Sequence, residues 1–512
     1  MLSQAIPNLF ARLSRFSEIL RMALPAILAL VLQVQFFGSA QPPAWPDEAL
    51  FSNPAGELAR GNGFKTMVLE GLVPGMEEAT LWNSPLYMTL LSGVYRISGE
   101  SLEAGRGLSL FLGILILIVF SGILHSLRVD RPLTFIAPLL LAMDPSFVRG
   151  SNVIRMDGLC LLFCMLALYF SYRAFQYKRD HYSFISGVFL GLGAMSHPAA
   201  LYGVAFVLMF HVFRWRGIFF AVCGTLLALS PWLAYIAEHF DIFALQFIPQ
   251  LMRKSGLLSL WGGPTGGIFV VFTSQYGGGA TSMLMVGLLV AFASILLLFI
   301  WKERLDSSEG GLVWLFRNDS LFLLSLSWPL VMAFCLLSVE GWYAMHVFPY
   351  LLLSTAAFFS SPFRMEKLRR RAGWLFRVFG LMILFIGIVN AHRYMVRDSD
   401  EIVDRSLKEM TEATSECSSV FARMVPDPYF SILEARPETR YYEFVPAKLS
   451  FPAGVVDPVK KYRTIDCFLL EGSGLQDGEV DRYIQKHIEE FERIPLAFSQ
   501  PANTGHLFKR KK

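Results

Sequence analysis

Residues 104–127 read AGRGLSLFLGILILIVFSGILHSL, and Arg106 is the only charged residue among them. About 20 consecutive apolar residues are needed to cross the hydrocarbon core of a bilayer, so this stretch predicts a transmembrane helix. Ten further apolar runs, several of them short or ending at proline or glycine, lie at 22–40, 132–148, 155–176, 183–197, 199–213, 217–237, 281–301, 320–338, 343–361 and 373–391. About eleven spans predict a polytopic α-helical membrane protein.

The composition of the whole chain agrees with this prediction. Of its 512 residues, 54% are hydrophobic and only 17% are charged, whereas soluble globular proteins are about 25% charged. These values exclude an ordinary soluble enzyme and a disordered chain. The net charge of +4 is too small to indicate nucleic-acid binding. The six cysteines show no spacing typical of a disulfide framework or of a zinc site.

The distribution of charge predicts the orientation, because loops rich in lysine and arginine stay on the cytoplasmic side. Residues 41–82 carry six acidic residues against two basic ones and are expected outside. Segment 84–98 contains Arg96 and is short for a span, so we expect it to lie along the membrane. The later basic loops then all fall inside, at 128–131, 173–179, 214–216 and 364–371. This places the N-terminus in the cytoplasm and residues 392–512 outside.

The run 22–40 could instead be a signal peptide that is removed after export. No convincing cleavage site of small residues follows it, and the alternation of charge works with this run retained. We therefore expect a transmembrane domain over 1–391, which includes a long outer loop at 41–103 with juxtamembrane helices. A second long outer loop is expected at 238–280.

The composition changes near residue 392, where charged residues become frequent and apolar runs shrink to strand length. Two helical segments are expected at 400–415 and 477–492, the second because of its amphipathic spacing. Strands are expected at 419–425, 440–445, 465–470, 496–499 and 506–509. This pattern predicts a small extracytoplasmic α/β domain over 392–512, with a structural or substrate-gating role.

Four clusters of polar residues fall at the outer ends of the predicted spans. They are Asp47-Glu48 after the first span, Arg155 with Asp157, His197, and Tyr343 with His346. A carboxylate at this level can act as a general base or bind a cation. The structural alternatives are solvated loop acids, an interfacial salt bridge and interfacial aromatic residues. The predicted topology brings all four clusters to the same leaflet, which suits transfer between a membrane lipid and a polar group.

These clusters resemble motifs of the GT-C superfamily, the integral-membrane glycosyltransferases that use polyprenyl-phosphate sugars. The similarity is to the branch of the protein O-mannosyltransferases and the aminoarabinose transferases of lipid A, and it runs in order through about residues 20–360. The matching segments are Trp45–Phe51 with 59–63, Ser84–Tyr87 with Gly99 and Arg106, Arg155–Asp157, Gly187–Gly193, and Trp342-Tyr343 with His346 and Pro349.

The resemblance implies an inverting transfer of a sugar from a polyprenyl-phosphate donor to a lipid, glycan or protein acceptor at the outer face of the plasma (inner) membrane. Asp47 would be the general base, with Glu48 and Asp157 as further catalytic carboxylates. The resemblance does not decide whether Asp47, Glu48 and Asp157 together hold a divalent cation. Substrate-binding residues would be Arg155, His197, Tyr343, His346 and Tyr87.

Two other classes of function compete with this interpretation. A lipid-linked-sugar flippase or transporter would place charged residues at the centres of its spans, yet the spans from residue 104 onward are nearly free of them. A non-enzymatic anchor for the C-terminal domain would need only one span, and it would leave Asp47 and Asp157 without a role.

Overall fold

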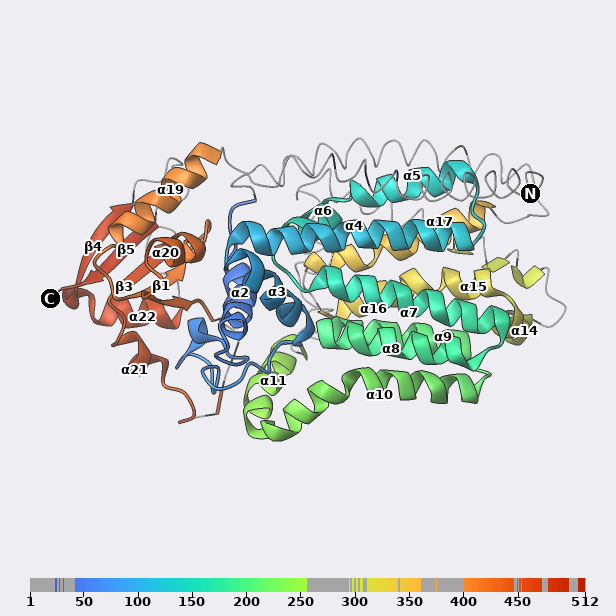
Figure 1. Cartoon of the computed structure of the whole chain (residues 1–512), viewed down its shortest axis with the longest axis horizontal. Coiled ribbons are helices and arrows are strands. Elements are labelled where there is room, and N and C mark those ends of the chain that lie inside the picture. Colours follow the sequence, from blue (N-terminus) through green and yellow to red (C-terminus); the bar gives the residue numbers. More distant parts are fainter. Residues whose placement is uncertain are drawn as a thin grey trace, which may run out of the picture.

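The computed structural model describes residues 42–255, parts of 294–306, 311–338, 341–360, 400–445 and most of 449–511, together with the isolated positions 24, 27, 31 and 374. Figure 1 shows a bundle of helices with a mixed α/β part at one end. The expected spans 22–40, 281–301 and 373–391 lie almost entirely outside the described residues. The expected domain boundary at 391/392 also lies outside them and stays a prediction.

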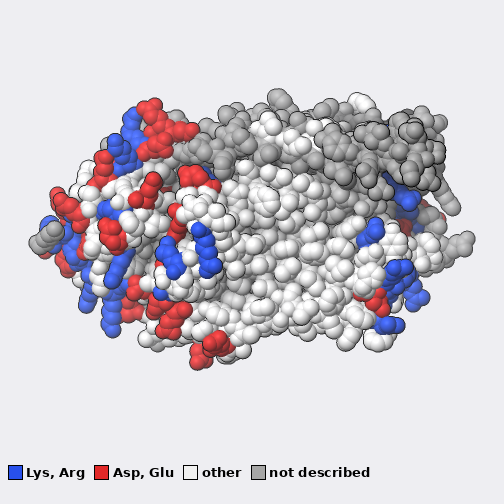
Figure 2. Space-filling view, in the orientation of Figure 1, with Lys and Arg blue, Asp and Glu red and all other residues white. Residues whose placement is uncertain are grey.

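Three described helices are long and apolar enough to cross a membrane: α4 (Leu102–Ser126), α7 (Asp157–Tyr177) and α10 (Trp215–Glu238). On the face shown in Figure 2, charged residues gather at the two ends of the molecule, and the described surface between them is free of them. A belt without charge is what contact with lipid tails requires. The structure therefore agrees with the prediction that this part of the chain lies in a membrane.

The expected span 132–148 is not one straight helix. The chain forms α5 (Arg131–Ala142) and α6 (Pro145–Asn152), which meet at an angle of 63°. The break has a local cause, because Asp144 caps α6 by accepting a hydrogen bond from the Phe147 amide at 2.9 Å, and Pro145 starts the new helix. If this bent pair is one span, the described residues contain up to four spans.

The remaining described helices of the bundle are shorter. They are α8 (Asp180–Ser196), η2 (Pro198–Ala200), α9 (Leu201–His211), α14 (Gly311–Asn318), α15 (Ser320–Ser325), α16 (Ser327–Ser338), η4 (Gly341–His346) and α17 (Phe348–Ser360). The expected spans 183–197 and 199–213 thus correspond to α8 and to η2 with α9. By length alone these do not reach across a bilayer, and the count of eleven spans stays a prediction.

A layer of short helices covers the bundle end nearest the α/β part (Figure 1). It contains α2 (Pro46–Ala59), η1 (Met67–Leu69), α3 (Leu86–Ser98) and α11 (Phe240–Ser255). Helix α3 is the segment expected to lie along the membrane, and it is not among the helices long enough to span. Gln246 on α11 holds the loop that carries Asp47 in place. Its side-chain oxygen accepts a hydrogen bond from the Leu81 amide at 2.7 Å, and its side-chain nitrogen donates to the Pro74 and Ala79 carbonyl oxygens at 2.8 and 2.9 Å. The rest of the second loop, from 256 to 280, lies outside the described residues.

The C-terminal part is a five-stranded sheet with flanking helices. In chain order its elements are α19 (Asp400–Ala413), β1 (Ser419–Arg423), α20 (Tyr429–Ala435), β2 (Arg440–Glu443), α21 (Pro458–Tyr462), β3 (Cys467–Glu471), α22 (Glu479–Lys486), η5 (Ile488–Glu490), β4 (Phe491–Leu496) and β5 (Gly505–Arg510). The strand order is β2-β1-β3-β5-β4. Strand β1 runs parallel to β2 and β3, while β5 is antiparallel to β3 and β4.

Two expectations for this part are wrong. The helix expected to run to residue 492 ends at Lys486, and the next strand begins at Phe491 instead of Leu496. Phe491 packs edge-on against Phe468 of β3, with ring centroids 5.6 Å apart, so the sheet captures the end of the amphipathic segment. The expectation that the cysteines form no disulfide framework is also wrong, because Cys417 and Cys467 form a disulfide across a sequence separation of 50 residues.

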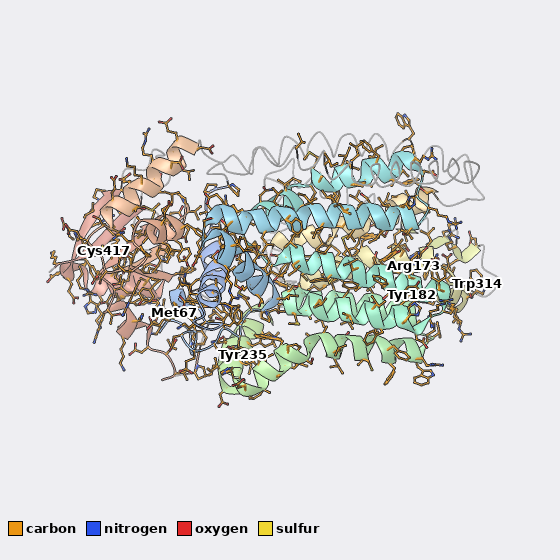
Figure 3. All side chains as sticks on the ribbon, in the orientation of Figure 1. Met67, Arg173, Tyr182, Tyr235, Trp314 and Cys417 are labelled. Atoms are coloured by element: carbon orange, nitrogen blue, oxygen red, sulfur yellow. A yellow bond between two sulfur atoms is a disulfide. The ribbon has the colours of Figure 1, made fainter. Side chains whose placement is uncertain are left out.

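The sheet and the loop that carries Asp47 share one hydrophobic core. Ala49, Leu50 and Val68 of the loop belong to the same buried cluster as Val420 and Tyr441 of the sheet. Figure 3 labels Met67, which lies in the loop, and Cys417, which precedes β1 and belongs to this cluster. The C-terminal part is therefore packed directly on the loop that carries Asp47.

Polar contacts reinforce this packing. Tyr429 donates to Glu100 at 2.6 Å, and Glu70 accepts from Lys461 at 3.1 Å and from Tyr442 at 3.3 Å. Burial raises the pKa of Glu100 above its ordinary value, although Tyr429 and Arg60 lower it in part.

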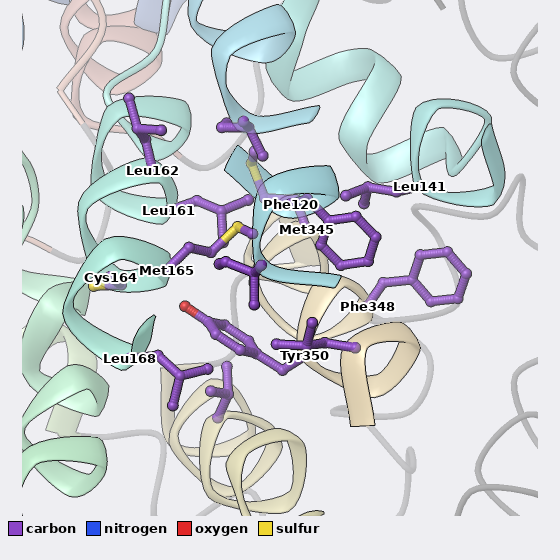
Figure 4. Packing of buried hydrophobic residues seen from close by; sticks show 14 of the residues in the cluster. Phe120, Leu141, Leu161, Leu162, Cys164, Met165, Leu168, Met345, Phe348 and Tyr350 are labelled. Atoms are coloured by element: carbon purple, nitrogen blue, oxygen red, sulfur yellow. The ribbon is translucent and has the colours of Figure 1, made fainter. Parts of the chain in front are cut away.

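The bundle itself is held by a second buried cluster, seen from close by in Figure 4. Phe120 and Leu141 come from α4 and α5, and Met165 comes from α7. They pack with Met345 of η4 and Tyr350 of α17, which follow Met165 by 180 and 185 residues. This core fixes η4, and with it Tyr343 and His346, near the N-terminal end of α7.

Candidate active site

Asp47 and Glu48 occupy the first turn of α2. Pro46 begins the helix and Trp45 precedes it as the N-cap residue. Glu48 accepts a hydrogen bond from the Trp45 amide at 3.1 Å, as in a capping box. Acidic side chains are also favoured here by the positive end of the helix dipole. The local sequence Pro-Asp-Glu therefore places both carboxylates at the start of α2, where the helix meets the bundle.

Glu48 is completely buried and fully hydrogen-bonded. Its two carboxylate oxygens accept from Arg106 of α4 at 3.0 and 2.8 Å, and from the Ile154 amide at 3.0 Å, besides the Trp45 amide. The pair with Arg106 is itself almost fully buried. Glu48 therefore ties α2 to α4 and to the segment before α7, and no lone pair is left for a substrate.

Arg155 lies between two aspartates. Its Nε donates to Asp157 Oδ2 at 2.8 Å, and its terminal nitrogen makes a close ion pair with Asp47 Oδ2. The side chain of Arg155 is 8% exposed and that of Asp157 is 1% exposed, whereas that of Asp47 is 31% exposed. Asp47 is thus the member of this group that faces open space.

Asp157 starts α7 and approaches His346. Asp157 Oδ1 lies 3.7 Å from His346 Nε2, and neither atom has a hydrogen bond to a described residue. The other ring nitrogen of His346 bonds with the hydroxyl of Tyr202 on α9 at 2.8 Å. A chain of polar groups therefore runs from Asp47 through Arg155, Asp157 and His346 into the bundle.

His197 and Tyr343 form a second pair beside this chain. His197 Nδ1 accepts from the Ala199 amide at 2.7 Å, so in the neutral ring Nε2 carries the hydrogen. Nε2 lies 3.2 Å from the Tyr343 hydroxyl, which accepts this hydrogen. The ring centroids of Tyr343 and His346 are 6.1 Å apart. The structure thus brings His197, Tyr343 and His346 together, as the sequence predicts.

Tyr87 is a buried residue that packs against α2. It is fully buried on α3, its hydroxyl pairs with Ser109 at 3.0 Å, and its ring packs edge-on against Phe51 of α2. Burial raises the pKa of the phenol well above its ordinary value, so it stays protonated. Tyr87 therefore supports α2 from the interior of the protein, and a substrate on the exposed side of Asp47 would not reach Tyr87.

The carboxylates expected to hold a cation do not converge. Arg155 stands between Asp47 and Asp157, and Glu48 is engaged with Arg106. Among the residues that the structure describes, no three His, Cys, Asp or Glu side chains are arranged to hold a metal ion. Asp47, Glu48 and Asp157 therefore form no ligand set in this arrangement.

Two residues near the site are not among those that the sequence analysis singles out. The guanidinium of Arg149 on α6 lies 5.5 Å from the ring centroid of Trp45, next to Asp47. Arg149 directly follows the expected span 132–148, and its position depends on the bend at Asp144, which a straight span does not predict. Tyr202 lies in the apolar helix α9 and carries no signal in a single sequence.

Comparisons with known proteins find one matching family model and several similar folds. Residues 83–235 match the family model described as dolichyl-phosphate-mannose-protein mannosyltransferase. No curated protein sequence matches the chain. The fold is similar to that of ArnT from Cupriavidus metallidurans bound to undecaprenyl phosphate, with a TM-score of 0.56, 11% identity, and coverage of 94% of this chain and 97% of that chain.

Two weaker similarities are to the oligosaccharyltransferase of Archaeoglobus fulgidus and the Pmt1-Pmt2 protein O-mannosyltransferase complex of S. cerevisiae. The first has a TM-score of 0.48 and 9% identity, over 96% of this chain and 74% of that chain. The second has a TM-score of 0.33 and 21% identity, over 44% of this chain and 34% of that chain.

Proposed function

We propose, from the premise that this chain is a membrane glycosyltransferase of the GT-C superfamily, that it moves a sugar from a polyprenyl-phosphate donor to an acceptor at the outer face of the membrane. The observation that carries the proposal is the partly exposed Asp47 held against the buried Arg155. The similar protein ArnT binds undecaprenyl phosphate, which supports a donor of this class.

Asp47 is the general base of the proposed reaction. Its Oδ2 is paired with Arg155, while Oδ1 makes none of the hydrogen bonds found among the described residues. Oδ1 takes the proton of the acceptor hydroxyl or amine as that group forms a bond to the anomeric carbon. The bond from the anomeric carbon to the donor phosphate breaks on the opposite face, through an oxocarbenium-like transition state, and the sugar is inverted.

Arg155 stabilises the phosphate that leaves. It is a permanent cation beside Asp47, and a fixed charge in a poorly solvated site is effective against developing negative charge. His197, Tyr343 and His346 contribute hydrogen-bonding groups on the same side. Asp157 and Glu48 act as positioning residues in this proposal, since the first orients Arg155 and the second fixes the start of α2.

The proposed sidedness has two supports besides the charge of the loops. The disulfide between Cys417 and Cys467 belongs to the C-terminal part, and disulfides persist in oxidising compartments outside the cytoplasm. This part also packs on the loop that carries Asp47. We therefore place the site and residues 392–512 on the outer side of the plasma (inner) membrane, with the N-terminus in the cytoplasm.

The decisive test is Asp47→Asn. In proteoliposomes supplied with a synthetic polyprenyl-phosphate sugar and a membrane-lipid extract as acceptor, we expect release of polyprenyl phosphate to fall by about a hundredfold to ten-thousandfold, the usual contribution of a general base. Glu78→Gln is the matched control, because Glu78 is an exposed acid of the same outer loop. Full activity of a correctly inserted Asp47→Asn protein would rule out the mechanism.

The same proteoliposomes distinguish a transporter. A flippase moves the intact donor across the bilayer without cleaving it, so it would release no polyprenyl phosphate in either the wild type or the Glu78→Gln protein. We expect release in both.

A further inference from the structure

A large cavity opens at the end of the bundle that lies away from the candidate active site. It has a volume of about 1500 Å³ and is lined by the ends of α4, α5 and α7 and by Arg317 and Asn318 of α14. Figure 3 labels Arg173, Tyr182 and Trp314 at this end of the molecule. Arg106 and Arg128 mark the two ends of α4, so roughly 30 Å separate this cavity from Glu48 and Asp47.

Five cationic side chains line the cavity: Arg128, Arg131, Arg173, Lys178 and Arg317. None of them has a carboxylate of a described residue within 4 Å. Two acids nearby are already engaged, because Asp180 pairs with Arg214 and Arg216, and Asp319 pairs with Arg304. Asp130 stands between Arg128 and Arg131 in the sequence but makes no ion pair with a described residue, so among the described residues the cations of the cavity outnumber the carboxylates near them.

The ends of helices do not neutralise this charge. Helices α4, α7 and α14 end at the cavity, and each helix C-terminus carries about half a negative charge. Together with Asp130 these amount to roughly −2.5 against five full positive charges. The N-terminus of α5, which begins at Arg131, adds further positive character. A clear positive excess therefore remains.

The backbone at two of these residues is strained. Arg128 and Lys178 have φ angles of 56° and 55°, the left-handed region that favours glycine. Lys178 is the C-cap residue of α7, and Arg128 follows the C-cap residue of α4. Partial burial and the neighbouring Arg214 also lower the pKa of Lys178. An anion in the cavity would favour the charged form of this exposed side chain.

We propose that this cavity binds the phosphate-bearing head group of an anionic membrane lipid, in the leaflet opposite the candidate active site. The cavity lies where the apolar helices α4 and α7 end, which is the level of lipid head groups, and basic pockets between membrane helices are suited to such groups. Phe135, Tyr172 and Phe175 line it beside the cations and offer contact to the glycerol and upper acyl region. Its volume exceeds what a free phosphate needs.

The test compares lipids and variants with the full-length protein in nanodiscs. Discs of phosphatidylcholine alone are compared with discs that also contain phosphatidylglycerol, and both thermal unfolding and the retained lipid, by native mass spectrometry, are measured. We expect phosphatidylglycerol to raise the unfolding temperature and to stay bound to the wild type. In the triple variant Arg128→Gln, Arg131→Gln, Lys178→Gln we expect affinity to fall on the order of a hundredfold, since each basic side chain contributes about fivefold.

The matched control removes the same charge from exposed positions that do not line the cavity: Arg179→Gln, Arg216→Gln and Lys302→Gln. We expect it to keep the bound lipid. Equal loss in both triple variants, or protection by inorganic phosphate in neutral discs that matches that of phosphatidylglycerol, would overturn the proposal. The wild-type comparison does not depend on whether the variants fold, and the absence of any lipid effect there would overturn it as well.

Discussion

At the scale of single residues, the neighbours Asp47 and Glu48 differ completely in environment. Both are acids in the first turn of α2, and the one local difference is that Glu48 stands at the capping-box position. Glu48 turns inward and is saturated by Arg106 and two backbone amides, whereas Asp47 turns to the partly open side and meets Arg155. The sequence predicts an acidic pair at the site, but only the tertiary contacts show which acid has a lone pair to spare.

Glu48→Gln is expected to affect stability first. It breaks a buried ion pair and leaves the Arg106 charge uncompensated, which costs about 3–5 kcal/mol of unfolding free energy. Thermal unfolding in detergent should show a clear drop for Glu48→Gln and little change for Asp47→Asn. Equal unfolding temperatures for the two variants would contradict the assignment of Glu48 as a positioning residue.

Arg155→Lys tests the role of the guanidinium. One ammonium group cannot reach Asp47 and Asp157 in the geometry that two separate guanidinium nitrogens provide. We expect the charge to be kept and kcat to fall by about 10- to 100-fold, with insertion in the membrane unchanged. The control is Arg216→Lys, an exposed arginine far from the site. Activity equal to that of the wild type would remove Arg155 from the mechanism.

At the scale of elements, the motif Gly187–Gly193 explains the close packing of α8 on α10. A Cβ added at Gly187 would lie 1.9 Å from the Ala221 carbonyl oxygen, and one added at Gly191 would lie 2.7 Å from the Thr225 carbonyl oxygen. Thr225 also donates to the Gly187 carbonyl oxygen at 3.0 Å. Small residues let membrane helices approach in this way, so this motif is structural.

Gly187→Ala should therefore force α8 and α10 apart. Overpacking of this kind costs about 1–3 kcal/mol, and we expect a lower unfolding temperature and less folded protein. Gly122→Ala on α4 is the matched control, because a Cβ there has no atom within 4 Å and alanine favours the helix. The explanation fails if both alanine variants unfold at the temperature of the wild type.

At the scale of the whole molecule, the C-terminal part and the loop that carries Asp47 are packed together through one hydrophobic core. The Asp427 amide donates to the Ala44 carbonyl oxygen at 2.8 Å, three residues before Asp47. The Asp427 carboxylate accepts from Tyr441 and from the Tyr429 amide, both at 2.8 Å, and it lies beside the buried Glu443. Burial raises the pKa of both carboxyl groups, and for Glu443 the charge of Asp427 raises it further. The folded protein therefore favours the protonated form of this pair.

This pair predicts how stability depends on pH. A carboxyl group whose pKa is higher in the folded chain contributes its full stabilisation below the unfolded value of about 4, and the contribution is lost as pH rises through the folded value. We expect this pair to lower the unfolding temperature of the wild type progressively as pH rises above about 4. Glu443→Gln, which cannot ionise, should flatten this dependence. Glu434→Gln, an exposed acid of α20, should leave it as in the wild type, and a profile unchanged by Glu443→Gln would contradict the assignment.

The sequence by itself determined what depends on local composition. The apolar runs around α4, α7 and α10 identify membrane helices, and the motifs around Asp47, Arg155, His197 and His346 indicate one site at one end of the bundle. These signals are local because solvation by lipid or water acts on each segment separately.

Only the tertiary structure decided which partners meet across the chain. Arg106 neutralises Glu48 across 58 residues, Cys417 meets Cys467 across 50, and the sheet packs on the loop that carries Asp47. The bend at Asp144 likewise set the position of Arg149. Such contacts depend on how helices and strands are packed against one another, and a pattern read along one segment holds no information about its partner.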